Sequence, residues 1–520
     1  MLRGKGIGIN YSQTNFKNSL PKKCEEDATH SESIDVRIWL VKPPLSGYPQ
    51  KVELDFEACY QALSARDRRF DGKFFTAVTS TGIYCRTVCP ARPPLKKNIR
   101  FYACAAAAEA GGFRPCKRCR PDTAPGSPAW AGTSTTVQRA LRLISDGALA
   151  DGDIEILAAR LGIGGRHLRR LFQDELGAAP LAIAHVERLH FARKLIEETN
   201  LPLAGIAFHA GFQSIRRFND ALKAALGKSP SELRKSRKTV FEGDWLTLRL
   251  PYAEPFDWDG ILAFLTPRAI AGVETIAPDC YRRNFATAEG TGQLEVRHLP
   301  LKRCIELRLT RVDPAALQSL VKKVRRLFDL DAEPLRIAAH LGADKLLEPL
   351  VAARPGLRVP GAFDAFELMV RAVLGQQVTV AGASTLAGRL VANWGKNGLF
   401  PEPDTMAEAD LASIGLPGKR AETLRGVAKQ FAVNPNFLAA ATGLEDAVQQ
   451  MVALNGIGPW TAHYVAMRAL AEPDAFPASD LGLMKAAAIM DPKKLEQRAE
   501  AWRPWRAYAA MHLWMGGKQQ

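Results

Sequence analysis

The chain has 520 residues, more than one hydrophobic core usually fills, so several domains are expected. Its 70 Lys and Arg against 54 Asp and Glu give a net charge of +16 and a pI near 9.5, which favours a polyanionic partner. No run of about 18 apolar residues and no apolar signal core is found, which predicts a cytoplasmic protein without a membrane partner. In that compartment a tight cysteine cluster would bind metal or carry out chemistry.

The first part of the chain is expected to lie outside any folded domain. Residues 1–53 mix charge, Ser, Asn and Pro without sustained periodicity, which predicts a disordered extension. A globular pattern starts at Leu54 and continues to about 122. Residues 123–136 are rich in Pro, Gly, Ser and Thr and are predicted to form a linker.

Two close cysteine pairs lie in the segment 54–122. Three residues separate Cys85 from Cys89, two separate Cys116 from Cys119, and 26 lie between the pairs. Because each pair can span one edge of a tetrahedron, this spacing predicts a site for one Zn²⁺ ion. From the spacing alone, the ion could be purely structural.

The residues around the cysteines are strongly basic. They are Arg86, Arg92, Lys96, Lys97, Arg100, Arg114, Lys117, Arg118 and Arg120. This basic collar, which includes the DNA-binding candidate Arg118, is expected to hold a DNA backbone against zinc thiolates. A purely structural site would not need so much charge.

The block from TSTGIYCRTVC to FRPCKRCRPD resembles the N-terminal domain of the Ada adaptive-response proteins. The resemblance implies that Cys85 is both a zinc ligand and the acceptor of a methyl group from a methylphosphotriester, in a single turnover. Zinc keeps a thiol deprotonated at neutral pH, and the thiolate is the species that attacks carbon. Methylation would also remove one negative charge from a surface facing phosphates, which is expected to tighten promoter binding.

Residues 137–238 contain two similar units, at 154–177 and 203–230. In each, a short apolar helix and a small-residue turn lead to a basic helix. The basic residues are Arg166, Arg169 and Arg170 in one unit and Arg216 and Arg217 in the other. A plain helical bundle would explain one such unit, whereas the pair predicts a tandem helix-turn-helix domain that binds DNA. The segment GFQSIRRFNDALKAALGKSPSELR resembles the AraC-type DNA-binding domain, which implies a promoter-binding regulator that works with RNA polymerase.

Residues 243–353 alternate apolar and polar residues over short runs, which predicts an α+β domain with helices packed on one face of a sheet. From 354 to 520 the pattern is helical. Within it, Gly456 and Gly458 form a two-glycine turn between two helical patterns. The free amides that begin the second helix would suit a DNA phosphate. An ordinary helix connection is the alternative.

The hairpin is followed by Trp460, Tyr464 and a lone Asp480. This arrangement resembles the helix-hairpin-helix base-excision DNA glycosylases, and within them the 3-methyladenine DNA glycosylase II (AlkA) group. The wider match includes residues 352–381 and 502–517, and 243–353 is similar to the N-terminal region of that group. The resemblance implies that Asp480 stabilises an oxocarbenium-like sugar or orients water, whereas a salt-bridged structural aspartate is the alternative.

The resemblance also implies a base pocket made of Trp460, Tyr464 and Trp514, in which electron-rich rings favour positively charged alkylated purines. Gln376 and Gln377 occupy the segment that fills the gap left by a flipped nucleotide, although a polar face of an ordinary helix is an equal alternative. Trp460 stands where backbone-cutting relatives carry a lysine nucleophile, which predicts a monofunctional enzyme.

Together these features predict a multidomain protein that is predominantly α with α+β parts. It combines a zinc methyl acceptor, a transcription regulator and a glycosylase acting on alkylated bases in double-stranded DNA. The alternative is a regulator whose glycosylase-like half only binds DNA. A further alternative is that the zinc site is structural and that the protein is an enzyme with a targeting module.

Overall fold

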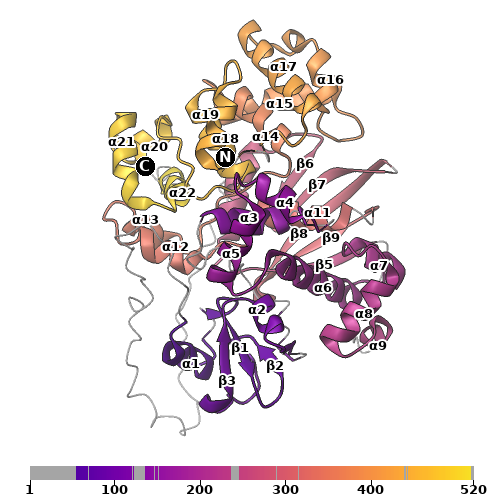
Figure 1. Cartoon of the computed structure of the whole chain (residues 1–520). Coiled ribbons are helices and arrows are strands. Elements are labelled where there is room, and N and C mark those ends of the chain that lie inside the picture. The colour runs from indigo at the N-terminus through magenta and orange to yellow at the C-terminus, as the bar shows by residue number, and fades with distance from the viewer. Residues whose placement is uncertain are drawn as a thin grey trace, which may run out of the picture. The chain divides into compact units, whose positions relative to one another are not determined.

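The computed structural model describes residues 54–67, 70–116, 118–119, 121, 135–145, 147–149, 152–235, 245–288, 290–313, 316–438, 441 and 443–516. The predicted extension at 1–53 and residues 123–134 of the predicted linker lie outside this part of the chain. The described residues form two sheets and a larger number of helices (Figure 1). This confirms the prediction of a multidomain protein that is predominantly α with α+β parts. None of the described helices is long and apolar enough to cross a membrane.

The N-terminal domain is a small four-stranded sheet with two helices. Its elements are α1 (Phe56–Ser64), β1 (Phe75–Val78), β2 (Ile83–Cys85), η3 (Lys96–Asn98), β3 (Ile99–Tyr102), α2 (Ala105–Ala110) and β4 (Arg114–Pro115). The strand order is β3-β1-β2-β4, and β2 runs parallel to β4 with Tyr84 opposite Pro115. Parallel strands end at the same edge of a sheet. Cys85, which ends β2, therefore lies near Cys116, which follows β4.

The next domain consists of seven helices among the described residues. They are α3 (Thr135–Ser145), α4 (Ile154–Ala159), α5 (Gly165–Leu176), α6 (Pro180–Glu198), α7 (Leu203–His209), α8 (Ile215–Leu226) and α9 (Pro230–Lys235). Gly162 and Gly211 occupy the turns of the two helix-turn-helix units with φ of 70° and 79°, a left-handed conformation that favours glycine. In both units the second helix ends on a left-handed glycine, Gly177 or Gly227. The two units are therefore built alike.

The α+β domain has a five-stranded antiparallel sheet in the order β5-β9-β8-β7-β6. Its elements are β5 (Leu246–Pro251), α10 (Trp258–Leu265), η6 (Thr266–Arg268), β6 (Glu274–Ala277), β7 (Cys280–Thr287), β8 (Gly290–Leu299), η7 (Pro300–Lys302), β9 (Cys304–Leu309) and α11 (Leu317–Leu327). Alternate residues such as Leu248 and Leu250, or Ile305 and Leu307, are buried, which is the predicted alternation.

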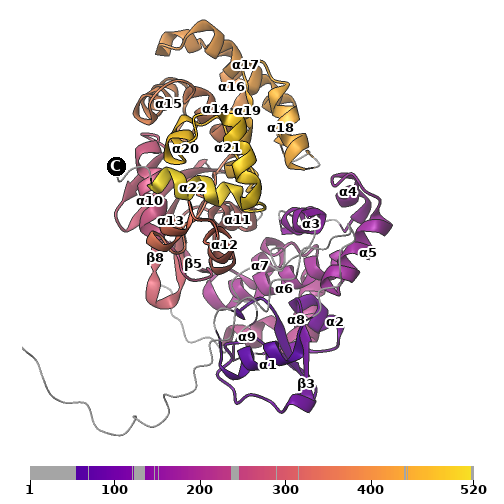
Figure 2. The same ribbon diagram turned by 90° about the vertical axis from the view of Figure 1, so that its left-hand side faces the viewer.

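The C-terminal part is helical. Its elements are α12 (Pro334–Leu341), α13 (Glu348–Ala353), α14 (Ala365–Leu374), α15 (Val380–Trp394), α16 (Pro403–Glu408), η9 (Leu411–Ile414), α17 (Gly418–Val433), α18 (Leu444–Val452), α19 (Pro459–Ala469), α20 (Leu481–Ala486), α21 (Pro492–Ala499), η11 (Glu500–Trp502) and α22 (Arg506–Gly516). Helices α20 and α22 lie side by side (Figure 1; Figure 2). This contact brings the residue before α20, Asp480, close to Trp514 on α22.

Candidate functional sites

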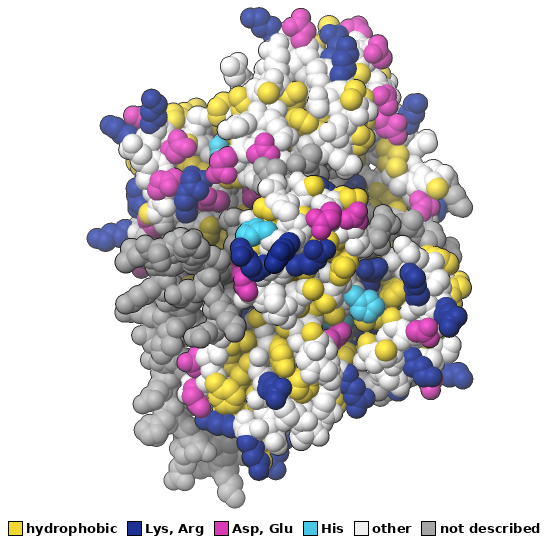
Figure 3. Space-filling view, in the orientation of Figure 1, with side chains coloured by type: hydrophobic (Ala, Val, Ile, Leu, Met, Phe, Trp, Pro, Cys, Tyr) yellow, Lys and Arg dark blue, Asp and Glu magenta, His cyan; other side chains and the backbone are white. Residues whose placement is uncertain are grey.

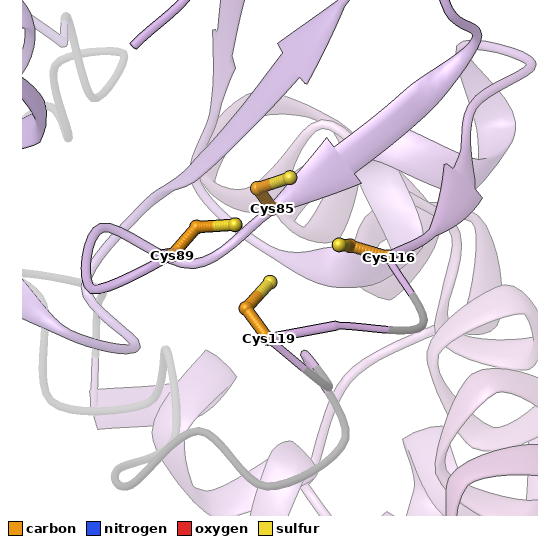
Figure 4. Close-up of side chains that lie close together, drawn as sticks. All are labelled: Cys85, Cys89, Cys116 and Cys119. Carbon is orange, nitrogen blue, oxygen red and sulfur yellow. The ribbon is translucent and has the colours of Figure 1, made fainter. Parts of the chain in front are cut away.

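The four predicted zinc ligands come together at one edge of the small sheet. The Sγ atoms of Cys85, Cys89, Cys116 and Cys119 all lie within 4.8 Å of one another. Figure 4 shows the four sulfur atoms arranged around a common centre. Four thiolates at Zn–S distances of about 2.3 Å would stand roughly 3.8 Å apart in a tetrahedron, so only small shifts are needed to hold the ion. An all-sulfur donor set of this size fits zinc.

Hydrogen bonds distinguish the four sulfur atoms. The backbone N–H of Arg86 donates to Cys119 Sγ and that of Arg118 donates to Cys116 Sγ, both at 3.4 Å. Cys89 has a backbone hydrogen bond with Ala91. Among the described residues, no backbone N–H donates to the sulfur of Cys85.

Exposure follows the same division. Cys89, Cys116 and Cys119 are 5%, 8% and 9% exposed, whereas Cys85 is only half-buried. Cys85 is thus the least buried of the four residues, and within the described part of the chain it is the one whose sulfur accepts no backbone N–H. A thiolate with free lone pairs and an open approach is the better nucleophile.

Only part of the predicted basic collar faces solvent. Arg86 is half-buried, its Nε donates to Asp71 Oδ1 at 2.8 Å, and its Nη1 donates to the carbonyl of Cys119 at 3.4 Å. It therefore braces the cysteine cluster and is not a free surface charge. The exposed members are Arg92, Lys96, Lys97, Arg100, Arg114 and Arg118. Lys117 and Arg120 lie outside the described residues.

The predicted DNA-contacting arginines of the helix-turn-helix units are all exposed. They are Arg166, Arg169 and Arg170 on α5 and Arg216 and Arg217 on α8. Figure 3 shows a row of Lys and Arg side chains over the region of α3, α4 and α5. Arg169 lies 3.4 Å from Glu155, and that carboxylate also accepts the N–H of Gly165 at the start of α5. Exposed ion pairs of this kind contribute little to stability, so these arginines can exchange partners.

Asp480 stands at the N-terminus of α20 with three N–H donors around its carboxylate. Oδ1 accepts from the backbone of Leu483 and from the indole of Trp514, both at 2.9 Å. Oδ2 accepts from the indole of Trp460 at 2.8 Å. These contacts fix the carboxylate without neutralising it, because all three donors are uncharged. The sequence left a salt-bridged structural aspartate as the alternative. The structure shows two indole N–H groups and one backbone N–H at the Asp480 carboxylate.

The aromatic residues surround this carboxylate. Trp460 and Tyr464 are stacked, with ring centroids 5.4 Å apart and planes 8° apart. The ring of Trp514 meets Tyr464 at 6.3 Å and 66°. All three side chains are half-buried, so the group is an open aromatic corner and not a closed core. A flat cationic base could lie against such a corner.

The glycines of the hairpin between α18 and α19 have different roles. Gly456 has a φ of 81°, and a Cβ there would lie 2.0 Å from Thr423 Oγ1. It is therefore required by packing against α17. Gly458 caps α19 ahead of Pro459, with open space around the position of its missing Cβ. The free amides that could bind a phosphate are those at the start of α19.

Gln376 and Gln377 point in different directions. The amide of Gln376 donates to the carbonyl of Gly456 and to Thr461 Oγ1, both at 3.1 Å, so this side chain ties the segment to the hairpin. Gln377 is exposed and has a φ of 56°, a strained conformation for a residue other than glycine. Of the two, only Gln377 is free to enter DNA.

Family models match nearly all of the described chain. They are the metal binding domain of Ada at residues 58–122, a helix-turn-helix domain at 157–236, the AlkA N-terminal domain at 247–364 and the HhH-GPD superfamily base excision DNA repair protein at 370–506. A protein of Mycobacterium tuberculosis (strain H37Rv) described as "Probable bifunctional transcriptional activator/DNA repair enzyme AlkA" is 43% identical over 479 residues, which cover 88% of this chain and 96% of the relative. The chain belongs to this AlkA family of bifunctional proteins.

Other relatives of this AlkA-family chain match its parts. DNA-3-methyladenine glycosylase 2 of Escherichia coli (strain K12) is 36% identical over 276 residues, or 51% of this chain and 95% of the relative. The bifunctional transcriptional activator/DNA repair enzyme Ada of the same organism is 34% identical over 175 residues, or 34% of this chain and 48% of the relative. The chain therefore combines two parts. One is regulatory and binds one Zn²⁺ ion, and the other is a DNA glycosylase.

Three residues next to the sites were not predicted from the sequence. Asp71 holds Arg86 beside the cysteines. Gly482 leaves room for the carboxylate, since a Cβ there would lie 3.0 Å from Asp480 Oδ1 and 3.5 Å from Trp514 Cδ1. Arg468 is 3% exposed and donates to the hydroxyl of Tyr464 at 2.6 Å.

Arg468 also changes the chemistry of Tyr464. Burial alone would raise the pKa of the Tyr464 phenol, but the nearby charges of Arg468 and Arg268 outweigh burial and lower that pKa below its ordinary value. An arginine four residues after Tyr464 is the only sequence signal for this contact, and it also fits an exposed helix face.

Proposed function

We propose that this AlkA-family chain excises 3-methyladenine and other alkylated bases from double-stranded DNA by hydrolysing the N-glycosidic bond. The observation that carries the proposal is the Asp480 carboxylate, held by Trp460, Trp514 and the N–H of Leu483 beside an aromatic corner. A carboxylate has about four acceptor positions, so one remains to face the sugar or to orient the attacking water. Its negative charge is already in place when positive charge develops on the sugar.

In this proposal the damaged nucleotide leaves the duplex and its base stacks on the aromatic corner. A purine alkylated at N3 or N7 is cationic, so it is attracted to the rings of Trp460, Tyr464 and Trp514 and leaves as a neutral base. Gln377 fills the gap in the duplex, and the amides near Gly456 and Gly458 bind a backbone phosphate. No lysine stands at position 460 to form a Schiff base, so the enzyme is monofunctional.

The test is release of 3-methyladenine from methylated duplex DNA by wild type, Asp480→Asn and Asp491→Asn. Asp491 is a matched control. Its carboxylate also caps a helix, α21, but the residue is exposed and lies outside the aromatic corner. We expect Asp480→Asn to lose about 10²- to 10³-fold in rate and Asp491→Asn to keep the wild-type rate. No release by folded wild type would favour a regulator with an inactive glycosylase-like module.

We also propose that Cys85 accepts a methyl group from a methylphosphotriester in DNA. The four cysteines would hold the zinc ion, which keeps their sulfurs deprotonated. A new bond forms between Cys85 Sγ and the methyl carbon, the bond from that carbon to the phosphate oxygen breaks, and a phosphodiester anion leaves. The exposed members of the collar, Arg118 among them, bind the flanking phosphates.

The regulatory proposal follows from the loss of charge at Cys85. A thioether in place of a thiolate removes one negative charge facing DNA, which would strengthen promoter binding through Arg166, Arg169 and Arg170 on α5 and Arg216 and Arg217 on α8. The regulator would then recruit RNA polymerase in the cytoplasm. The functional units proposed here are 54–122, 137–238, 243–353 and 354–520.

A further inference from the structure

The hydroxyl of Tyr464 has an unusual hydrogen-bond environment. Arg468 Nη1 lies 2.6 Å from it, and a guanidinium group carries only donors, so the phenol oxygen must be the acceptor. Within the described part of the chain, no acceptor for the phenol's own proton is found. The Tyr464 side chain is half-buried in the aromatic corner beside Asp480. Its ring lines the aromatic corner, and the proton of its hydroxyl is available to an acceptor on a bound molecule.

Arg468 cannot easily turn away from this hydroxyl. Its Nε donates to the carbonyl of Pro360 at 2.8 Å and its Nη2 donates to the carbonyl of Gly361 at 3.0 Å. Its guanidinium carbon lies 5.0 Å from the centre of the Phe264 ring. Two carbonyls and a ring thus fix the plane of the guanidinium, and the third arm of the group holds the phenol oxygen.

A role in stability alone would explain the two carbonyl contacts, which join α19 to the segment before α14. It does not require the third contact, to a residue of the aromatic corner. Positive charge behind the phenol also makes its O–H a stronger donor, in agreement with the lowered pKa of Tyr464 caused by Arg468 and Arg268 against the effect of burial.

We propose that Arg468 is a positioning residue that makes the Tyr464 hydroxyl a hydrogen-bond donor to the flipped base, and that this donor serves bases that leave without a positive charge. The proposal rests on the glycosylase function proposed above. An uncharged purine takes the electron pair of the broken glycosidic bond and becomes an anion until water supplies a proton. A donor at one of its ring nitrogens or carbonyl oxygens stabilises that anion. An N3- or N7-alkylated purine leaves neutral and gains little from the same donor.

The test compares single-turnover release of hypoxanthine, an uncharged base, with release of 3-methyladenine, a cationic one. The proteins are wild type, Tyr464→Phe, Arg468→Lys and the double variant, all as full chains. We expect Tyr464→Phe to slow hypoxanthine release at least about tenfold more than it slows 3-methyladenine release. Arg468→Lys should shift the ratio in the same direction, and should add nothing to the ratio when Tyr464→Phe is already present.

Tyr508→Phe is the matched control, because the Tyr508 hydroxyl is also buried and hydrogen-bonded, to Asp329 at 2.8 Å, but takes no part in the aromatic corner. It should leave the ratio unchanged even if thermal unfolding shows a similar loss of stability. An equal fall for both bases with Tyr464→Phe would overturn the proposal, as would wild type that releases 3-methyladenine but not hypoxanthine. Failure to release either base would instead remove the glycosylase function itself.

Discussion

The two chemical centres of this chain use N–H donors in opposite ways. At Asp480 three donors converge on the group proposed to act, from Trp460, Trp514 and Leu483. At the cysteine cluster the backbone donors go to the sulfurs of Cys89, Cys116 and Cys119, and Cys85 receives none among the described residues. The same kind of contact therefore goes to the group proposed to react in one centre and to the groups proposed not to react in the other.

The chemistry explains the difference. A carboxylate that acts through its charge is unchanged by each turnover, so contacts that fix it in place help every cycle. A thiolate that attacks carbon must give up a lone pair, and a hydrogen bond to that lone pair lowers its reactivity. Hydrogen bonds that hold the carboxylate thus favour repeated turnover. A centre that reacts once favours one sulfur without a backbone hydrogen bond, because that sulfur keeps its reactivity.

The largest expected effect comes from replacing Cys85. Cys85→Ala should abolish methyl transfer from methylated DNA to the protein, because the remaining sulfurs are buried and hydrogen-bonded. Peptide mass spectrometry of the treated protein would locate the methyl group. Cys104→Ala is the control, since Cys104 is buried outside the cluster and should leave transfer intact. A methyl group on Cys116 or Cys119 of the Cys85 variant would show that hydrogen-bonded sulfurs also react, which would contradict the comparison.

A smaller effect is expected from removing one donor to the carboxylate. Trp514→Phe keeps a ring in the corner but deletes the indole N–H that binds Asp480 Oδ1. Hydrogen bonds to a charged group contribute about 1.5–3 kcal/mol, which predicts a roughly 10- to 100-fold slower release of 3-methyladenine.

Trp502→Phe controls for the loss of an indole N–H. Trp502 is buried and donates to Asp344 at 2.9 Å, so its variant should unfold at lower temperature but excise at the wild-type rate per folded chain. If both tryptophan variants slow excision alike, the donors at Asp480 serve stability and not the reaction.

The smallest effect is expected from crowding the carboxylate. Gly482→Ala would place a methyl group 3.0 Å from Asp480 Oδ1, so the carboxylate must shift by a few tenths of an ångström. We expect excision to fall about three- to tenfold, because small displacements of a preorganised charge reduce transition-state stabilisation. In the control, Gly426→Ala on α17, the added methyl meets no neighbour within 4 Å, so kinetics should not change. An unchanged rate for Gly482→Ala would show that the position of the carboxylate is not critical.

The sequence predicts the cysteine centre better than the glycosylase centre. Cysteine spacing alone predicts a cluster of Cys85, Cys89, Cys116 and Cys119, because few other uses of four thiols suit that pattern. Asp480 is found only through a resemblance, since a lone aspartate before a short helix has no distinctive pattern. The fold class follows from periodicity, which predicts both the alternating strands and the helical C-terminal part.

The sequence is least successful in predicting which arginines are exposed and which are buried. Arg86 was expected to face DNA, but it turns inward to Asp71. Arg468 was not predicted at all, although it is buried against Tyr464. Whether an arginine is a surface charge or a buried brace depends on carbonyls and carboxylates that are distant in the chain, such as Pro360 for Arg468. Local sequence does not contain that information.

The most direct test counts products per chain. Excess DNA carrying 3-methyladenine and methylphosphotriesters is incubated with the full chain, and released base and methyl bound to protein are measured over time. We expect methyl uptake to stop at one per chain, on Cys85, while release of 3-methyladenine continues far past one per chain. Base release that stops near one per chain, or methyl uptake that passes it, would contradict the distinction between a consumed centre and one that turns over.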